Sequence, residues 1–302
     1  MHLRSFLFLV PAVCVALCSP SSLRAQPSSA TFRPALIDTF SASYSASAGG
    51  DLARGAATVG DVSLRRFEFS VSGRQPLNAK TIFIPGLAYA HTTIDASPGV
   101  PLPSSVQELS VSLGLRGALN EKWAYGTFLR PGFYGDFKNL GSDSFNAPLF
   151  LAAFYSASPT LTWTFGAGIN AFNDNVVLPA VGVNWKFAPD WQLDVGFPRT
   201  AITYTATSHL SFRAGLSVLG GNYRITENLG VPAPGVARLA PTLLDLTEVR
   251  VGAGLFYRFA SGVELDLDAG TTTLRRFDYP DRNYRLNGDN VGWLSLALKR
   301  RF

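Results

Sequence analysis

Residues 161–172 read LTWTFGAGINAF, and their apolar side chains recur at every second position. The apolar set begins with Leu161, Trp163, Phe165, Ala167 and Ile169, and threonine, glycine or asparagine stands between its members. Successive side chains of a β-strand point to opposite faces, so this alternation predicts a strand with one apolar and one polar face. Strands of soluble proteins usually have about five or six residues, whereas a tilted strand that crosses a bilayer needs about 9–11.

The same alternation recurs along the chain, for example in LSVSLGLRG (109–117), WQLDVGF (191–197) and VELDLDAG (263–270). Convincing helical periodicity does not recur. We therefore expect strands, most of them ten or more residues long, at 35–46, 62–73, 80–92, 106–118, 122–134, 148–157, 160–171, 176–187, 190–197, 200–205, 208–221, 243–259, 263–275 and 291–302.

The connections between these strands fall into two sets. Tight turns are expected at 119–122, 157–160, 188–190, 206–209 and 260–262, and longer polar links at 47–61, 93–105, 135–147, 222–242 and 276–290. Short turns at one rim and long loops at the other are typical of bacterial outer-membrane barrels. An even number of strands also returns both chain ends to the short-turn rim.

Composition favours a sheet that meets lipid. The 302-residue chain is 47% hydrophobic and only 16% charged, against about 25% charged residues in soluble domains. No segment after the amino-terminal stretch has the ~18 consecutive apolar residues of a transmembrane helix. Only helices and closed sheets satisfy their backbone groups inside a bilayer. The sequence therefore predicts an all-β fold, a single transmembrane antiparallel up-and-down β-barrel.

The strand number is about twelve, or fourteen if the short pair 190–197 and 200–205 belongs to the wall. Pro198 interrupts the alternation between the two members of that pair. The alternative to a barrel is a soluble β-sandwich with an aromatic core, which the strand length disfavours.

The amino-terminus reads as a secretory signal peptide over residues 1–25. A short positive start precedes the apolar stretch FLFLVPAVCVAL (6–17), and small residues follow, with a cleavage site after Ala25. Residues 26–34 are then a short periplasmic leader, and 35–302 the outer-membrane barrel. A membrane anchor or a lipoprotein cleaved before Cys18 are the alternatives.

Both cysteines, Cys14 and Cys18, lie inside this signal. The exported chain therefore has no disulfide or thiolate site, and its two remaining histidines make a transition-metal site improbable. Removal of Arg4 and Arg24 lowers the net charge from +5 to +3, too small and scattered to indicate nucleic acid as a partner. We expect no cofactor, no metal and no catalytic residue, and the oligomeric state stays open.

Aromatic residues lie close to the predicted strand ends, as the interfacial girdles of a barrel require. The five tryptophans are Trp123, Trp163, Trp185, Trp191 and Trp293, and we expect Trp293 near the outer rim.

The chain ends on Phe302, preceded at every second position by Leu298, Leu296 and Leu294. This ending resembles the carboxy-terminal signal read by the outer-membrane barrel assembly machinery, although Arg300 stands where that signal usually has an apolar residue or tyrosine. More broadly, 32–302 resembles an uncharacterised family of outer-membrane β-barrel proteins, chiefly through WQLDVGFPRTAITYTATSHLSFRAGL (191–216). The resemblance implies that the protein lies in the cell outer membrane of a Gram-negative-type envelope, with outer-membrane lipid as its partner. It assigns no reaction to the protein.

Two histidines invite an enzymatic interpretation. His209 stands two residues before Ser211, which resembles the core of outer-membrane phospholipase, but Phe212 and Arg213 replace the residues that follow the serine there. His91 and Asp95 resemble part of an outer-membrane protease site that needs further carboxylates. A barrel-embedded lipid hydrolase is therefore a remote alternative.

A charged lumen is the stronger signal. The predicted charge ladder runs across three neighbouring strands, where opposed charges stabilise the pairing or set the field that a solute meets. Its members are Glu264, Asp266, Asp268, Arg250, Arg258, Lys299 and Arg301, and Arg65, Glu68, Arg116, Arg130 and Arg213 are candidate extensions.

The sequence therefore favours a passive narrow channel or a structural barrel. The alternative is a binding or adhesion barrel that uses its long loops, of which RRFDYPDRNYRLNGDN (275–290) has a composition suited to ligand contact.

Overall fold

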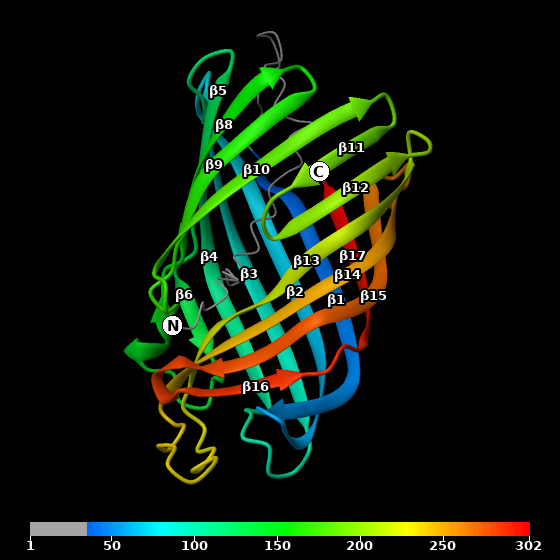
Figure 1. Cartoon of the computed structure of the whole chain (residues 1–302). Coiled ribbons are helices and arrows are strands. Elements are labelled where there is room, and N and C mark those ends of the chain that lie inside the picture. The colour runs from blue at the N-terminus through cyan, green and yellow to red at the C-terminus, as the bar shows by residue number, and fades with distance from the viewer. Residues whose placement is uncertain (1–34) are drawn as a thin grey trace, which may run out of the picture.

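A computed structural model describes residues 35–302 as one closed antiparallel β-barrel. The signal peptide, its cleavage site at Ala25 and the leader 26–34 lie outside the described residues. Seventeen strand segments form a single sheet, which closes where β1 pairs with β17. Three of the wall strands are interrupted (β5 with β6, β7 with β8, β16 with β17), so the wall has fourteen strands (Figure 1).

The strand bounds, in chain order, are β1 Ala35–Arg54, β2 Ala57–Asn78, β3 Thr81–Ala96, β4 Ser105–Ala118, β5 Trp123–Leu129, β6 Gly132–Gly135, β7 Phe145–Asn146, β8 Leu149–Ser158, β9 Leu161–Ile169, β10 Val177–Ala188, β11 Trp191–Val195, β12 Arg199–Thr205, β13 Leu210–Ile225, β14 Thr242–Arg258, β15 Val263–Tyr279, β16 Tyr284–Gly288 and β17 Gly292–Arg301. Two short 3-10 helices, η2 (Ser142–Ser144) and η3 (Pro280–Arg282), lie in connections. No helix in the described part of the chain is long and apolar enough to span a membrane.

The predicted all-β barrel is confirmed, and the short pair β11–β12 belongs to the wall. The expected polar link at 47–61 is wrong. Strands β1 and β2 continue through it and join at a two-residue turn, 55–56. Leu52 and Val62 are completely buried there, so sparse apolar residues at alternate positions sufficed for a strand where glycine and serine suggested a loop.

The connections define two rims. The turn rim carries the short connections 79–80, 119–122, 159–160, 189–190, 206–209 and 259–262, together with the start of β1 and the end of β17. The opposite loop rim carries 97–104, 226–241 and 280–283 (Figure 1).

The outer face of the barrel is apolar. Alternate residues of paired strands expose Leu294, Leu296 and Leu298 of β17 beside Tyr44 of β1 and Phe67 of β2. Near the turn rim the exposed face carries a belt of aromatic residues, namely Trp123, Trp163, Trp185, Phe187, Trp191, Tyr204, Phe212, Tyr257, Phe259 and Phe302. An apolar band bordered by aromatic rings is what a barrel needs to lie in a bilayer.

Towards the loop rim the fourteen-strand wall narrows to a smaller ring. The carboxyl end of β6 leaves β7 and pairs in parallel with β13, through Gly135 and Arg224. On the other side β16 pairs with both β15 and β1. The strands β1, β2, β3, β4, β6, β13, β14, β15 and β16 therefore close a ring of nine that omits β8 to β12. An antiparallel ring needs an even number of strands, so the ninth forces one parallel pair.

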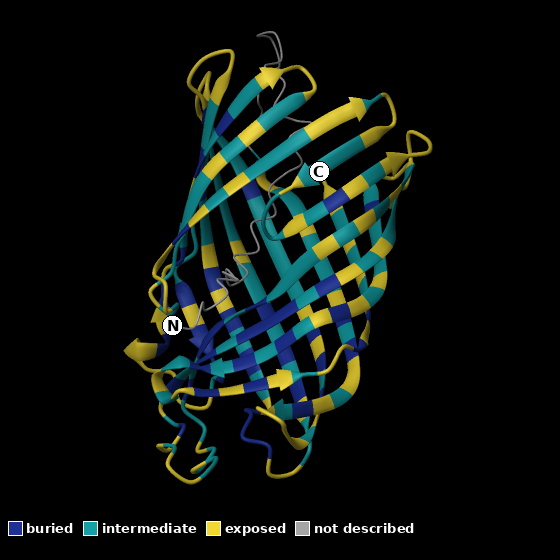
Figure 2. Cartoon of the chain, in the orientation of Figure 1, coloured by how far each residue is buried: buried dark blue, intermediate teal, exposed yellow. Residues whose placement is uncertain are grey.

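This nine-strand ring is filled by an apolar core, which we call the plug. Figure 2 shows the buried residues gathered in the loop-rim half of the barrel. The plug comprises Leu52, Val62, Leu64, Ile94, Val100, Leu102, Val106, Tyr134, Tyr223, Ile225, Leu239, Leu244, Leu246, Phe277, Tyr279, Tyr284 and Leu286. The barrel is thus packed solid at one end.

We expect Phe277→Ala to lower the free energy of unfolding by about 3–5 kcal/mol, because it removes a completely buried ring from a packed core. Phe145→Ala, which truncates an exposed ring on the outer face, is the matched control. Urea unfolding in a lipid or detergent that supports refolding measures both. Equal effects of the two substitutions would contradict a packed plug.

Candidate functional site

The lumen beyond the plug is polar over much of its wall. Lumen-facing positions of β12 to β15, β17, β1 and β2 near the turn rim are mainly serine, threonine, glycine and charged residues, whereas Phe128 of β5 and Phe150 and Phe154 of β8 give the facing wall an aromatic patch. Two groups of charges line this lumen, one buried directly beneath the plug and one closer to the turn rim.

The charge layer on the turn-rim side of the plug centres on Glu248, which is completely buried. Its carboxylate accepts hydrogen bonds from Arg275 at 2.8 Å, Arg250 at 2.6 Å and the Ser47 hydroxyl at 3.0 Å. Arg275 also donates to the Val62 carbonyl at 2.9 Å. A buried charge is tolerated only when it is paired and hydrogen-bonded, and these contacts meet that condition.

A second part of this layer lies on the facing strands. Arg66 donates to Glu68 at 2.6 Å, to Thr92 at 2.9 Å and to the Tyr223 hydroxyl at 3.0 Å. Arg130 pairs with Glu108 next to it. These contacts join β2 and β3 to β13 across the lumen, so the layer reinforces the narrowing of the barrel.

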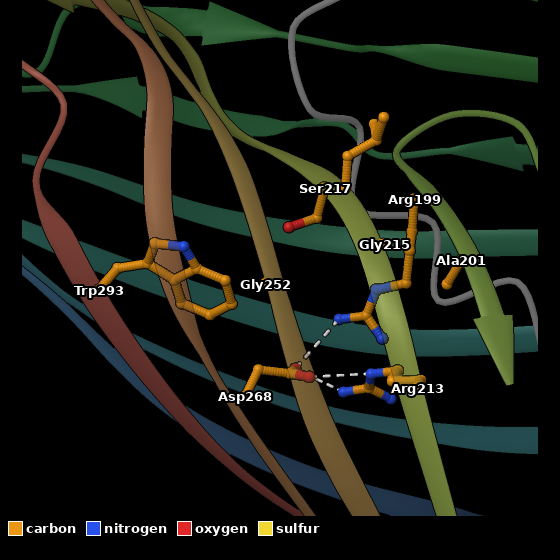
Figure 3. Close-up of a pocket in the computed structure, with 9 residues that line it drawn as sticks. Arg199, Ala201, Arg213, Gly215, Ser217, Gly252, Asp268 and Trp293 are labelled. Atoms are coloured by element: carbon orange, nitrogen blue, oxygen red, sulfur yellow. Dashed lines mark hydrogen bonds and ion pairs between the residues drawn. The ribbon is translucent and has the colours of Figure 1, made fainter. Parts of the chain in front are cut away.

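Arg213 is the centre of the group nearer the turn rim. Its guanidinium on β13 reaches over β14 to pair with Asp266 and Asp268 of β15. Figure 3 shows the contact with Asp268. The β14 residue between them is Gly254, where an added Cβ would collide with the Asp268 carboxylate. Glycine is therefore what permits this contact between next-nearest strands. Arg199 of β12 approaches Asp268 at 3.5 Å.

The predicted charge ladder is thus brought together only in part. Arg258 pairs with Glu264 at 3.1 Å, whereas Asp266 and Asp268 turn to Arg213. Arg250 binds Glu248 of its own strand rather than the acidic residues of β15. Lys299 and Arg301 lie at lumen-facing positions of β17, and within residues 35–302 no salt bridge engages either of them.

Two other expectations are corrected. Trp293 does not belong to the outer girdle. It faces the lumen, is 9% exposed and lies beside Arg250, whose guanidinium carbon is 5.2 Å from the ring centroid. The alternation across β17 makes this unavoidable once Leu294 faces lipid. Arg65 likewise faces outwards, where it pairs with Asp95 at 3.5 Å.

The carboxy-terminal residues lie as the alternation predicts. Leu294, Leu296, Leu298 and Phe302 are exposed on the outer face. Arg300 shares that face and places its guanidinium 4.8 Å from the Phe302 ring centroid. Their role as an assembly signal stays a prediction.

The histidines do not form the proposed enzymatic sites. The His209 ring lies on a turn at the rim and is 3.1 Å from the Arg258 carbonyl. His91 lies on the outer face beside Tyr89. The described residues contain no group of three or more His, Cys, Asp or Glu side chains able to hold a metal ion.

The wall is incomplete on the loop-rim side of the hairpin β11–β12. These strands have only five and seven residues, and their pairing ends at Val183–Val195 and Arg199–Ser217. Beyond this level no described strand lies between the facing edges of β10 (177–182) and β13 (218–223). We call this interruption the wall gap. On its loop-rim side, the Asn170 amide donates to Asn222 at 3.0 Å.

Sequence reasoning missed several of these residues. Glu248 and Arg275 lie beyond a bulge that shifts the register of β14 and β15 between Val249 and Arg250, so simple alternation assigned them no partner. Arg199 follows the interruption at Pro198. Gly254 could have been found from the sequence, because alternation places it on the lumen face between Arg213 and Asp268 of the neighbouring strands.

The chain matches the family described as "Domain of unknown function (DUF6268)" over residues 74–286. It belongs to that family. The predicted membership of an uncharacterised outer-membrane barrel family is thereby confirmed. No curated protein matches the DUF6268 chain.

Three solved structures are similar to this DUF6268 barrel in fold. The COG4313 outer membrane channel from Pseudomonas putida F1 is 15% identical, with a TM-score of 0.49 over 91% of this chain and 99% of that one. A Pseudomonas aeruginosa FadL homologue is 13% identical, with a TM-score of 0.46 over 88% and 90%. The P. putida toluene transporter TodX is 12% identical, with a TM-score of 0.42 over 97% and 94%. The likeness is one of fold.

We expect Arg213→Gln to lower the free energy of unfolding by about 3 kcal/mol, because it leaves two carboxylates without their cation in the lumen. Adding Asp266→Asn and Asp268→Asn should restore most of that loss. Arg258→Gln breaks a half-exposed pair at the rim and should cost less than about 1 kcal/mol. Urea unfolding compares the three, and an Arg213→Gln effect no larger than that of Arg258→Gln would contradict the assignment.

Proposed function

We propose that this protein is an integral outer-membrane channel whose lumen opens at the turn rim and whose route to the other side leaves through the wall gap. The observation that carries the proposal is the nine-strand ring, which closes the loop rim while it leaves β8 to β12 outside.

The plug opposes a straight axial path. Its side chains are almost completely buried, and a paired charge layer lies directly beneath it. An ion that crossed this end would have to displace packed apolar groups and lose its hydration, which is costly. The axial path is therefore closed in this conformation.

The wall gap supplies the alternative. Val177 and Val181, on the β10 edge of the gap, are exposed and apolar, which supports their lying at the depth of the lipid. Unpaired backbone groups are not stable in hydrocarbon unless they line a cavity or are covered by protein. The facing edges of β10 and β13 are thus suited to a passage between lumen and membrane.

A catalytic role has less support. The Ser211 hydroxyl has no contact with His209 among the described hydrogen bonds, and the His209 ring is already directed at a main-chain carbonyl. A purely structural barrel is the remaining alternative, and it predicts no solute movement by any route.

Planar-bilayer recording tests the closed axis. We expect the folded wild-type barrel to show no long-lived ionic conductance steps at moderate voltage, because the plug leaves no hydrated path. Stable unitary steps would contradict the closed axis.

Uptake of 2-naphthoate into proteoliposomes tests the side route. Ala180 faces the lumen on β10 beside the wall gap, and Ala88 faces it on β3. We expect wild-type protein to accelerate uptake over protein-free liposomes, Ala180→Trp to remove most of that acceleration and Ala88→Trp to retain it. The absence of any acceleration would favour a structural barrel, and equal losses in both variants would contradict passage through the gap.

A further inference from the structure

The β10 edge of the wall gap cannot form a complete ladder with another strand. The Asn170 N–H donates to the Val176 carbonyl, and the Lys186 N–H donates to the Thr160 carbonyl, so alternate main-chain groups of β10 point towards β9. The groups between them, including those of Pro179, point away from β9 and into the gap. Proline has no N–H and is confined to the edges of sheets. Strand β10 therefore keeps a free edge along the gap.

Side chains close the gap at its loop-rim end, where backbone pairing does not. The Asn146 amide donates to the Asn170 Oδ1 atom at 2.7 Å, and the Asn170 amide donates to the Asn222 Oδ1 atom at 3.0 Å. Asn146 and Asn222 are only 4% and 5% exposed. The three residues belong to β7, to the connection 170–176 between β9 and β10, and to β13. We call this chain of three side chains the asparagine bridge.

The asparagine bridge has a defined direction. The Asn170 Oδ1 atom also accepts a hydrogen bond from the Phe172 N–H at 3.0 Å, so this oxygen serves two donors. The Asn170 amide nitrogen is then the group that faces Asn222. The connection 170–176 thus orients the side chain that reaches across the gap.

The connection 170–176 has few other attachments to the ring of nine. Among the described hydrogen bonds, the Asn170–Asn222 bond is the one that joins it to β13. Phe172 packs, partly buried, against the plug, whereas Asp174 and Asn175 are exposed. A side-chain hydrogen bond of this kind shifts an equilibrium by only about two- to tenfold. The end of the β9–β10 hairpin can therefore leave β13 at a lower cost than paired strands can separate.

We propose that the asparagine bridge limits the size of the solute that leaves through the wall gap. With the bridge made, the end of the β9–β10 hairpin lies against β13 and the gap ends at Asn222. With the bridge broken, that end can move away from β13, because β10 has a free edge there, and the gap becomes longer. The proposal rests on the channel function, because it names the residues that select solutes by size on the same route.

Uptake of two aromatic carboxylates into proteoliposomes tests this, with protein-free liposomes subtracted. Pyrene-1-carboxylate has a larger ring system than 2-naphthoate and carries the same charge. We expect Asn170→Ala and Asn222→Ala each to raise the ratio of pyrene-1-carboxylate to 2-naphthoate uptake about three- to tenfold, because each loses the bond to the opposite edge. The matched control is Asn175→Ala, an exposed asparagine of the same connection, which should keep the wild-type ratio. A wild-type ratio in both bridge variants would overturn the proposal.

A cysteine pair tests the bridge by breaking and restoring it in one protein. Cys14 and Cys18 fall in the predicted signal peptide, so Asn170→Cys with Asn222→Cys would supply the only thiols of the exported barrel. We expect the reduced pair to show the raised ratio, and the pair joined by a short bismaleimide to return to the wild-type ratio or below it. Heat-modifiable migration confirms that each variant is folded. Failure of the folded pair to crosslink, or a ratio that joining leaves unchanged, would contradict the proposal.

The channel and the bridge fail in different ways. If the wild-type protein accelerates the uptake of neither solute, the channel function is rejected and the bridge has no transport to select. If uptake is accelerated but neither loss nor joining of the bridge changes the ratio, the bridge proposal alone is rejected.

Discussion

The carboxylate of Asp136 is the contact on which the shape of this barrel depends. It accepts hydrogen bonds from the main-chain N–H groups of Thr226 and Glu227, both at 2.6 Å, and from the Thr226 hydroxyl at 2.8 Å. The main-chain N–H of Asp136 donates to the Arg224 carbonyl at 3.0 Å. These bonds attach the end of β6 to the end of β13, although β8 to β12 lie between them in the wall. We call this junction between the ends of β6 and β13 the seam. Asp136 is 2% exposed, so the seam is shielded from water.

Two features follow from this seam. A ring of nine strands is narrow enough for its side chains to meet across the axis, and the plug is the result. The five strands left outside the ring cannot follow β13 to the loop rim, so the wall gap opens beside β10. The same constraint therefore blocks one path and leaves another.

Much of the fold could be predicted because alternation is a local property. A strand such as β17 specifies its own lipid face from Leu294 to Leu298, and the short turns fix its neighbours. The seam could not be predicted, since it joins Asp136 to residues about ninety positions away through a parallel pair that no alternation encodes. The lumen charges were only partly predictable for related reasons. A bulge displaces Glu248 and Arg275, and Gly254 lets Arg213 bypass its immediate neighbour, so pairing by adjacent strands assigned the wrong partners.

Amide hydrogen exchange of the folded protein in lipid nanodiscs tests the seam most directly. The account predicts that the amide protons of Asp136, Thr226 and Glu227 exchange as slowly as those of paired residues in the middle of β14. Exchange of all three at the rate of exposed loop residues such as Asp174 and Asn175 would contradict it, because the ring of nine would then not be closed.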